Sequence, residues 1–136
     1  MPVVSWDILV LNLPLGAKTP DAISGSFEPG SIGRCSDIVA KIKDVVPTAD
    51  FSDPTWGLIE TDLFSIDVSI DSDGECEGFA IHIRNGDMAA GVVGAILERL
   101  GLRAIDTRSG GFFEADPKAI EAFRRWRARH GRATDV

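Results

Sequence analysis

The chain has 136 residues, 44% hydrophobic and 26% charged, a balance typical of one folded domain and not of a disordered chain. Its formal net charge is −7. Residues 117–136 hold six Lys or Arg and two acidic residues, a net charge of +4, so the first 116 residues carry a net charge of −11. An acidic body repels phosphate, which disfavours nucleic acid as a partner. Short apolar runs and the absence of an N-terminal secretory pattern predict a cytoplasmic protein with no membrane partner. We expect a single domain over residues 1–131 and a frayed tail over 132–136.

The first third of the chain combines a strand, a long loop and a helix. Residues 5–13 are apolar enough for a central strand, and the Gly- and Pro-rich residues 14–33 predict a loop, either functional or a simple connection. Apolar residues then recur at steps of three and four, which indicates a helix with Ser31 as its N-cap and Pro47 at its end.

The centre of the chain predicts strands. Residues 50–54 read as a turn that leads into a short strand at 57–62. Residues 63–70 and 79–84 then alternate between apolar and polar side chains on either side of a turn-rich acidic segment. We therefore expect an antiparallel hairpin whose apolar face packs on helices: Phe64, Ile66, Val68, Ile70, Phe79, Ile81 and Ile83.

The last third predicts two more helices around a second hairpin. A wide apolar face over residues 88–100 indicates a helix capped by Asp87 and closed by Gly101, and Gly91 and Gly94 would let it lie close to the sheet. Residues 102–107 and 111–114 form the hairpin. Asp116 followed by a proline then starts a helix over residues 117–130.

Together these elements predict an α+β fold in the order β-α-β-β-β-α-β-β-α. We expect a mainly antiparallel sheet of five or six strands, with two helices packed on one face and a third helix at the C-terminus.

The polar face of the central hairpin is the first candidate site. Pairing of the two strands brings Ser65, Asp67 and Ser69 beside His82 and Arg84, with Glu60 on the neighbouring strand. An Asp–His pair beside a serine has the components of a nucleophile, a base and an orienting group. The same residue types also form ordinary cross-strand ion pairs, such as Asp67 with Arg84, and the pattern lacks GxSxG. We therefore favour a solvated or partner-covered face over a catalytic one.

Metal, cofactor and disulfide chemistry find little support in the sequence. The two histidines, His82 and His130, are not at metal-ligand spacing, and the acidic residues 71–77 lack the glycine and glutamate positions of a calcium loop. No phosphate-binding fingerprint is present. Cys35 and Cys76 form no CxxC pair. We expect no metal, no cofactor and reduced thiols.

The C-terminal helix is the second candidate surface. It carries four arginines around one tryptophan, and Arg124 and Trp126 are its candidate binding residues. We expect the helix to dock on the acidic body through Phe123 and Trp126. The alternative is an exposed basic helix that meets RNA, a membrane surface or an acidic partner.

Two stretches carry a resemblance. Residues 100–114 (LGLRAIDTRSGGFFE) and 32–57 (IGRCSDIVAKIKDVVPTADFSDPTWG) resemble small bacterial α+β proteins, some of which look like immunity or accessory partners of toxins. The resemblance implies an immunity-like role. The missing catalytic constellation, the acidic body and the polar sheet face or edge favour a non-enzymatic protein that binds another protein, immunity-like, or a second copy of itself as a homodimer. The alternative is a small hydrolase-like enzyme that uses Asp67, His82 and Ser65 or Ser69.

Overall fold

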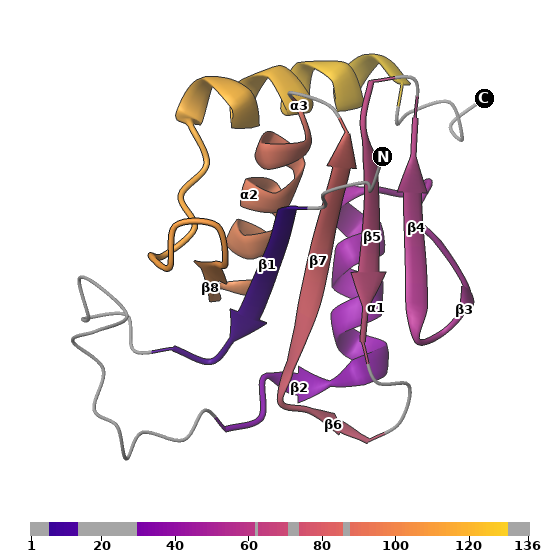
Figure 1. Ribbon diagram of the computed structural model, residues 1–136. Helices are drawn as coiled ribbons and strands as arrows, with labels where there is room; N and C mark the ends of the chain where they lie inside the picture. Colours follow the sequence, from indigo (N-terminus) through magenta and orange to yellow (C-terminus); the bar gives the residue numbers. More distant parts are fainter. Residues whose placement is uncertain (1–5, 14–29, 62, 71–73, 86–87, 131–136) are drawn as a thin grey trace, which may run out of the picture.

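The computed structural model describes residues 6–13, 30–61, 63–70, 74–85 and 88–130. These residues form an α+β fold, in which a six-stranded antiparallel sheet has helices on one face (Figure 1). The helices are α1 (Cys35–Val45), α2 (Ala89–Leu100) and α3 (Pro117–His130). The strands are β1 (Trp6–Leu11), β2 (Gly33–Arg34), β3 (Asp50–Asp53), β4 (Trp56–Glu60), β5 (Ser65–Ser69), β6 (Glu75–Cys76), β7 (Gly78–Asn85) and β8 (Arg103–Asp106). The predicted fold class and element order are confirmed.

The strand order of the large sheet is β3-β4-β5-β7-β1-β8, and every neighbouring pair is antiparallel. The first strand of the chain is therefore an interior strand, between β7 and the edge strand β8, as its apolar sequence predicts. β5 and β7 pair with Asp67 opposite His82, which confirms the central hairpin. β2 and β6 form a separate two-stranded ladder below it.

The core lies between the sheet and the two helices behind it. All seven apolar residues of the predicted hairpin face are buried, each exposed by 6% or less. Ile38 and Ile42 of α1 and Val92, Val93 and Ile96 of α2 close the other side. Burying one such side chain contributes roughly 1.5–3 kcal/mol, so this layer is the main source of stability.

α3 crosses the end of this sandwich and packs on α2 (Figure 1). The two glycines of α2 face α3 rather than the sheet, which corrects our expectation. A methyl group at Gly91 would collide with the carbonyl of Ala119, and one at Gly94 would lie 2.6 Å from the Cβ of Ala115. The missing side chains therefore let α3 approach α2.

Helix ends follow the predictions only in part. Gly101 closes α2 in a left-handed conformation (φ 67°), and Asp116 caps α3 by accepting a 2.9 Å hydrogen bond from the Lys118 N–H. Ser31 is not the cap of α1, which begins after Arg34. Its hydroxyl instead donates to Glu75 (2.5 Å) and accepts from the Gly33 N–H (3.0 Å). It therefore ties the segment before α1 to β6.

The predicted turn at residues 50–54 is wrong, because Asp50–Asp53 form the edge strand β3. Asp50 accepts hydrogen bonds from the backbone and hydroxyl of Ser52, and Asp53 accepts the same pair from Thr55. These are the bonds of Asx turns, in which an Asp side chain accepts hydrogen bonds from the residue two positions on. A register irregularity between Asp50 and Asp53 accommodates them in an edge strand.

Several sequence-based expectations lie outside the described residues. They concern most of the loop at 14–33, residues 71–73 of the acidic turn, the Asp87 cap and the tail at 132–136.

The two cysteines are closer in the fold than their sequence settings suggest. Cys35 begins α1, its N–H bonds the Gly74 carbonyl, and Gly33 pairs with Cys76 across the small ladder. Both side chains are buried, and the Cys76 Sγ donates a hydrogen bond to the Gly78 carbonyl (3.2 Å).

Candidate functional site

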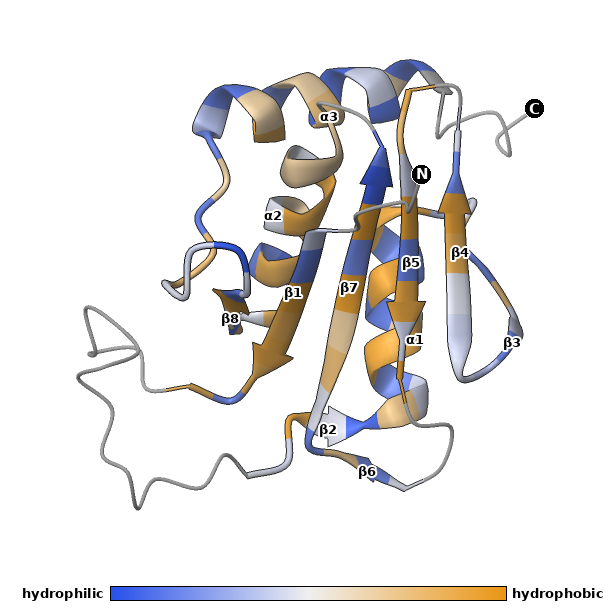
Figure 2. Ribbon diagram, in the orientation of Figure 1, coloured by the Kyte–Doolittle hydropathy of each residue, from blue (hydrophilic) through white to orange (hydrophobic). Residues whose placement is uncertain are grey.

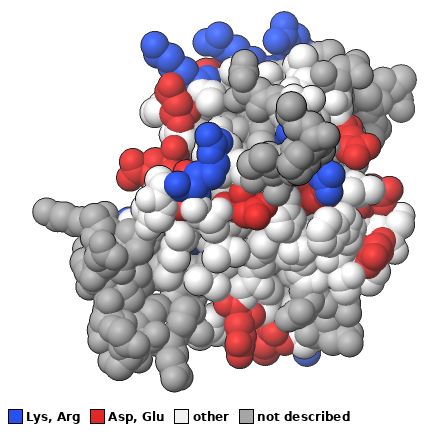
Figure 3. Space-filling view, in the orientation of Figure 1, with Lys and Arg blue, Asp and Glu red and all other residues white. Residues whose placement is uncertain are grey.

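The face of the sheet turned away from α1 and α2, hereafter the open face, carries the polar residues singled out in the sequence. Alternation assigns it the side chains that do not enter the core: Asp7, Leu9 and Leu11 of β1, Trp56, Leu58 and Glu60 of β4, Ser65, Asp67 and Ser69 of β5, and Ala80, His82 and Arg84 of β7. Figure 3 views the molecule from this side, and Lys and Arg gather over α3 at the top while the lower sheet is mostly uncharged.

His82 lies at the centre of the open face and joins three strands. Its Nδ1 is 2.8 Å from Asp7 Oδ1 on β1, and its Nε2 is 3.2 Å from Ser69 Oγ on β5. An ionised carboxylate only accepts hydrogen bonds, so Nδ1 carries the proton. In the neutral ring Nε2 is then an acceptor, and Ser69 donates its hydroxyl proton to it. The order Ser69–His82–Asp7, with these two nitrogens, is that of a nucleophile, a base and an orienting carboxylate.

Trp56 covers this chain of hydrogen bonds. Its ring stacks on that of His82, with centroids 5.6 Å apart and planes 16° from parallel. β5 lies between β4 and β7, so the Trp56 side chain spans it to reach the imidazole. The His82 side chain is left only 22% exposed. Trp56 contacts the face of its ring, and Asp7 and Ser69 bind its two nitrogens.

Asp67 is held by Arg84 and not by His82. The guanidinium Nε and Nη2 of Arg84 lie 2.7 and 2.6 Å from Asp67 Oδ2. The carboxylate side chain is 3% exposed, and the arginine side chain is 48% exposed. The expected cross-strand ion pair is confirmed, and it neutralises a charge that would otherwise be buried alone.

A depression of about 520 Å³ lies beside Ser69 at the lower end of the open face. Its walls include Leu9, Leu11 and Ala80, with Glu77 as a charged lining residue. Figure 2 shows the hydrophobic colouring of the lower part of β1, along which this depression lies. Ser69 is thus the polar end of a mainly apolar hollow.

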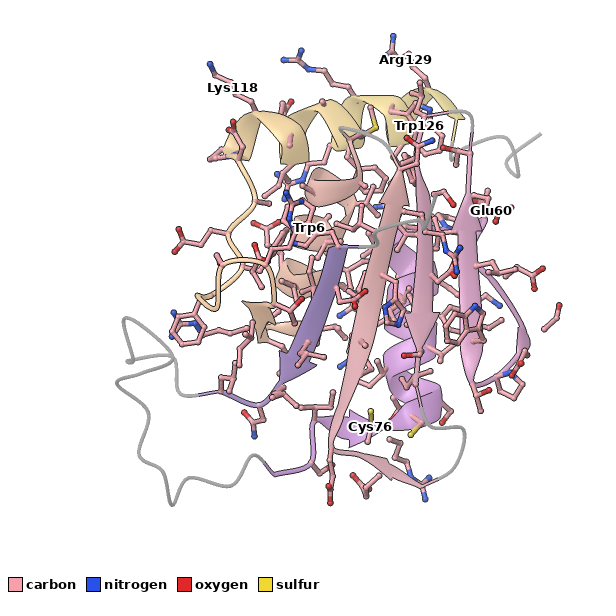
Figure 4. All side chains as sticks on the ribbon, viewed as in Figure 1. Trp6, Glu60, Cys76, Lys118, Trp126 and Arg129 are labelled. Carbon is pink, nitrogen blue, oxygen red and sulfur yellow. The ribbon has the colours of Figure 1, made fainter. Side chains whose placement is uncertain are left out.

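The candidate residues of α3 belong to a different surface. Trp126 turns inward onto Phe64 and Phe123, at centroid distances of 5.4 and 6.1 Å, and Arg124 pairs with Glu98 at 2.5 Å. Docking of this helix by Phe123 and Trp126 is therefore confirmed. Figure 4 shows Lys118 and Arg129 projecting away from the body along its outer side.

The structure brings together some of the predicted site residues and separates others. Ser69 and His82 touch, whereas Asp67 takes a different partner, and Ser65 and Glu60 pair at the far end of β4 and β5. Sequence reasoning missed Asp7 as the partner of His82. The available signal was Asp7 itself, a single acidic residue on the solvent-facing side of the apolar first strand. That β1 lies beside β7 is known only from the structure.

Chemically, the open face offers one ordered base, His82, hydrogen-bonded to the hydroxyl of Ser69. Within the described residues, no three His, Cys, Asp or Glu side chains are grouped to hold a metal ion. Among the described helices, none is both long and apolar enough to span a bilayer.

Comparison with known proteins adds no functional information, because no family model, curated protein or solved structure matches this chain.

Proposed function

We propose that this protein acts by binding another protein through the open face of its sheet. The observation that carries the proposal is the exposure of large apolar side chains there. Leu9 and Trp56 are each 39% exposed and Leu58 is 36% exposed, on strands whose opposite face forms the core. Tryptophan and leucine beside satisfied ion pairs resemble the centre of a protein interface, where apolar anchors are surrounded by polar contacts.

The sheet edges do not favour strand addition as the binding mode. β3, at one edge, has four residues, two of them aspartates, and an irregular register. β8, at the other edge, has four residues, and its Ile105 forms an isolated antiparallel β-bridge with Phe112. Short, charged and irregular edges resist pairing with another chain, so association through the face is the better alternative.

Charge favours a basic partner. The Asp67–Arg84 ion pair is internally neutral, whereas Asp7 beside the neutral imidazole leaves one negative charge on the open face. The first 116 residues as a whole carry −11. Such a field speeds the approach of a positively charged protein and opposes that of a second copy. The resemblance noted in the sequence implies that the partner would be a toxin and the role immunity-like.

The test is affinity capture from the source cell with the full chain and two matched variants. Leu58→Glu places a charge on the open face, and Ser36→Glu places the same charge on an exposed position of α1. We expect one basic protein to be retained by the wild type and by Ser36→Glu but lost with Leu58→Glu, and retention to weaken with salt. Equal capture by both variants, or a homodimer measured by light scattering with no further partner, would contradict the proposal.

A further inference from the structure

We infer that Ser69 is a nucleophile, activated by His82 and Asp7, that reacts with short-chain carboxylic esters bound in the neighbouring depression. The inference concerns reactivity and stands on the hydrogen-bond chain, independently of the proposed protein binding.

Geometry supplies the first argument. A serine hydroxyl becomes a useful nucleophile when an adjacent base can take its proton. Ser69 Oγ is within hydrogen-bond reach of His82 Nε2 (3.2 Å), and Asp7 holds the other nitrogen at 2.8 Å. The Asp7 contact fixes the tautomer in which Nε2 is the acceptor, so the proton of Ser69 already points at the base.

The surroundings of the imidazole keep this arrangement in place. Trp56 stacks on the ring, Asp7 faces it from β1, and Asp67 faces it from β5 with its charge paired to Arg84. The carboxylate of Asp7 stabilises the imidazolium that forms when His82 accepts a proton.

The depression supplies the second argument and the substrate class. An acyl carbon placed at Ser69 Oγ has a hollow of about 520 Å³ next to it, walled by Leu9, Leu11 and Ala80. Apolar walls favour a short alkyl chain, and Glu77 in the lining disfavours an anionic one.

The reaction balances with water as the second substrate. Ser69 Oγ bonds the acyl carbon while His82 Nε2 takes the hydroxyl proton, which then leaves with the alcohol. Water next attacks the acyl-serine, gives one proton to His82 and releases the acid, and His82 returns that proton to Ser69. Ester and water become acid and alcohol, with no change of oxidation state.

The rate is limited by oxyanion stabilisation. The Ile70 N–H donates to the Thr55 carbonyl, so alternation in the ladder turns the N–H of Ser69 toward β7, where it pairs. It cannot also serve the developing oxyanion. The loss of one oxyanion donor lowers the rate by about 100- to 1,000-fold, which is comparable to the acceleration that a general base supplies. We therefore expect slow turnover, confined to activated esters.

The experiment is covalent labelling of the full chain by an alkyl fluorophosphonate, followed by intact mass and peptide mapping. Ser69 Oγ bonds phosphorus and fluoride leaves, while its proton passes through His82 to solvent. We expect one addition, at Ser69, because its hydroxyl lies against the base. A matching slow hydrolysis of p-nitrophenyl butyrate should be lost once labelling is complete.

Variants distinguish activation of Ser69 by His82 and Asp7 from labelling of a serine that is merely exposed. His82→Gln should lower the labelling rate by at least about 100-fold, and Asp7→Asn should lower it while Asp7→Glu restores part of it. Ser36→Ala is the matched control, since Ser36 is an exposed serine on α1, away from the open face. It should leave the rate unchanged. The inference is overturned if the folded wild type takes no label, takes it at another residue, or keeps its Ser69 rate in a folded His82→Gln variant.

Discussion

Arg84 and Asp67 form an ion pair in which two guanidinium nitrogens donate to one carboxylate oxygen, at 2.7 and 2.6 Å. The pair is asymmetric, because the carboxylate is 3% exposed and the arginine side chain 48%. Removing the arginine leaves a buried charge without its donors. We expect Arg84→Met to lower the free energy of unfolding by about 2–4 kcal/mol, measured by urea denaturation at pH 7.

The double variant Asp67→Leu with Arg84→Met is the control for this prediction. Replacing both partners by apolar side chains removes the stranded charge, so the double variant should be more stable than Arg84→Met alone. A single variant within about 0.5 kcal/mol of the wild type, the usual range for surface positions, would show that water solvates Asp67 in the absence of Arg84.

Gly91 and Ala119 are in contact where α2 meets α3, and the contact predicts a test of the helix packing. Alanine at position 91 gains about 1 kcal/mol of helix propensity but places a methyl group against the Ala119 carbonyl. Overpacking typically costs about 1–3 kcal/mol, so we expect Gly91→Ala to be destabilising on balance and to loosen α3. Thermal unfolding and proteolysis within residues 117–130 measure both effects.

Ser36→Ala makes a similar small change to an exposed position of α1 and should be neutral within about 0.5 kcal/mol. A stabilised Gly91→Ala variant would mean that α3 can move aside at no cost.

Phe123 anchors α3 on the end of the sheet. It is 1% exposed and lies edge-on to Phe64, with ring centroids 6.2 Å apart. Truncating a buried aromatic residue removes its transfer free energy and leaves a cavity, which together cost about 3–5 kcal/mol. We expect Phe123→Ala to lose this much in chemical unfolding, and Arg125→Ala, on the exposed side of the same helix, to lose less than about 0.5 kcal/mol. Comparable losses in the two variants would mean that α3 is held by its charges.

The sequence predicted the layers of this fold because burial repeats with a clear period. Phe64, Ile66 and Val68 alternate, and the stripes of α1 and α2 recur at three and four residues, so each element signals its own buried face. The same local signals identified Asp116 and Gly101 as helix caps. Ser31 failed as a cap because a long-range partner, Glu75, competes for its hydroxyl.

The site could be predicted only in part, because it depends on strand order. Residue types and a hairpin turn suffice to place Asp67 beside Arg84 and Ser69 beside His82. Asp7 is 75 residues from His82, and it reaches the imidazole only because β1 inserts between β7 and β8. No local pattern specifies that insertion. Because Asp67 pairs with Arg84, the carboxylate that binds His82 is that of Asp7.

Asp53 and Thr55 give a prediction of pH dependence at the sheet edge. The pKa of Asp53 is lowered, first because the Thr55 hydroxyl donates to its carboxylate and then because the Thr55 N–H does. A lowered pKa in the folded state means that these bonds favour folding above the ordinary aspartate pKa. Their contribution is lost as the pH falls through the lowered value. We expect NMR titration to show Asp53 ionising below the ordinary aspartate pKa, and Thr55→Val to move its pKa back toward that ordinary value. An unchanged Asp53 titration in Thr55→Val would mean that the backbone N–H alone holds the turn.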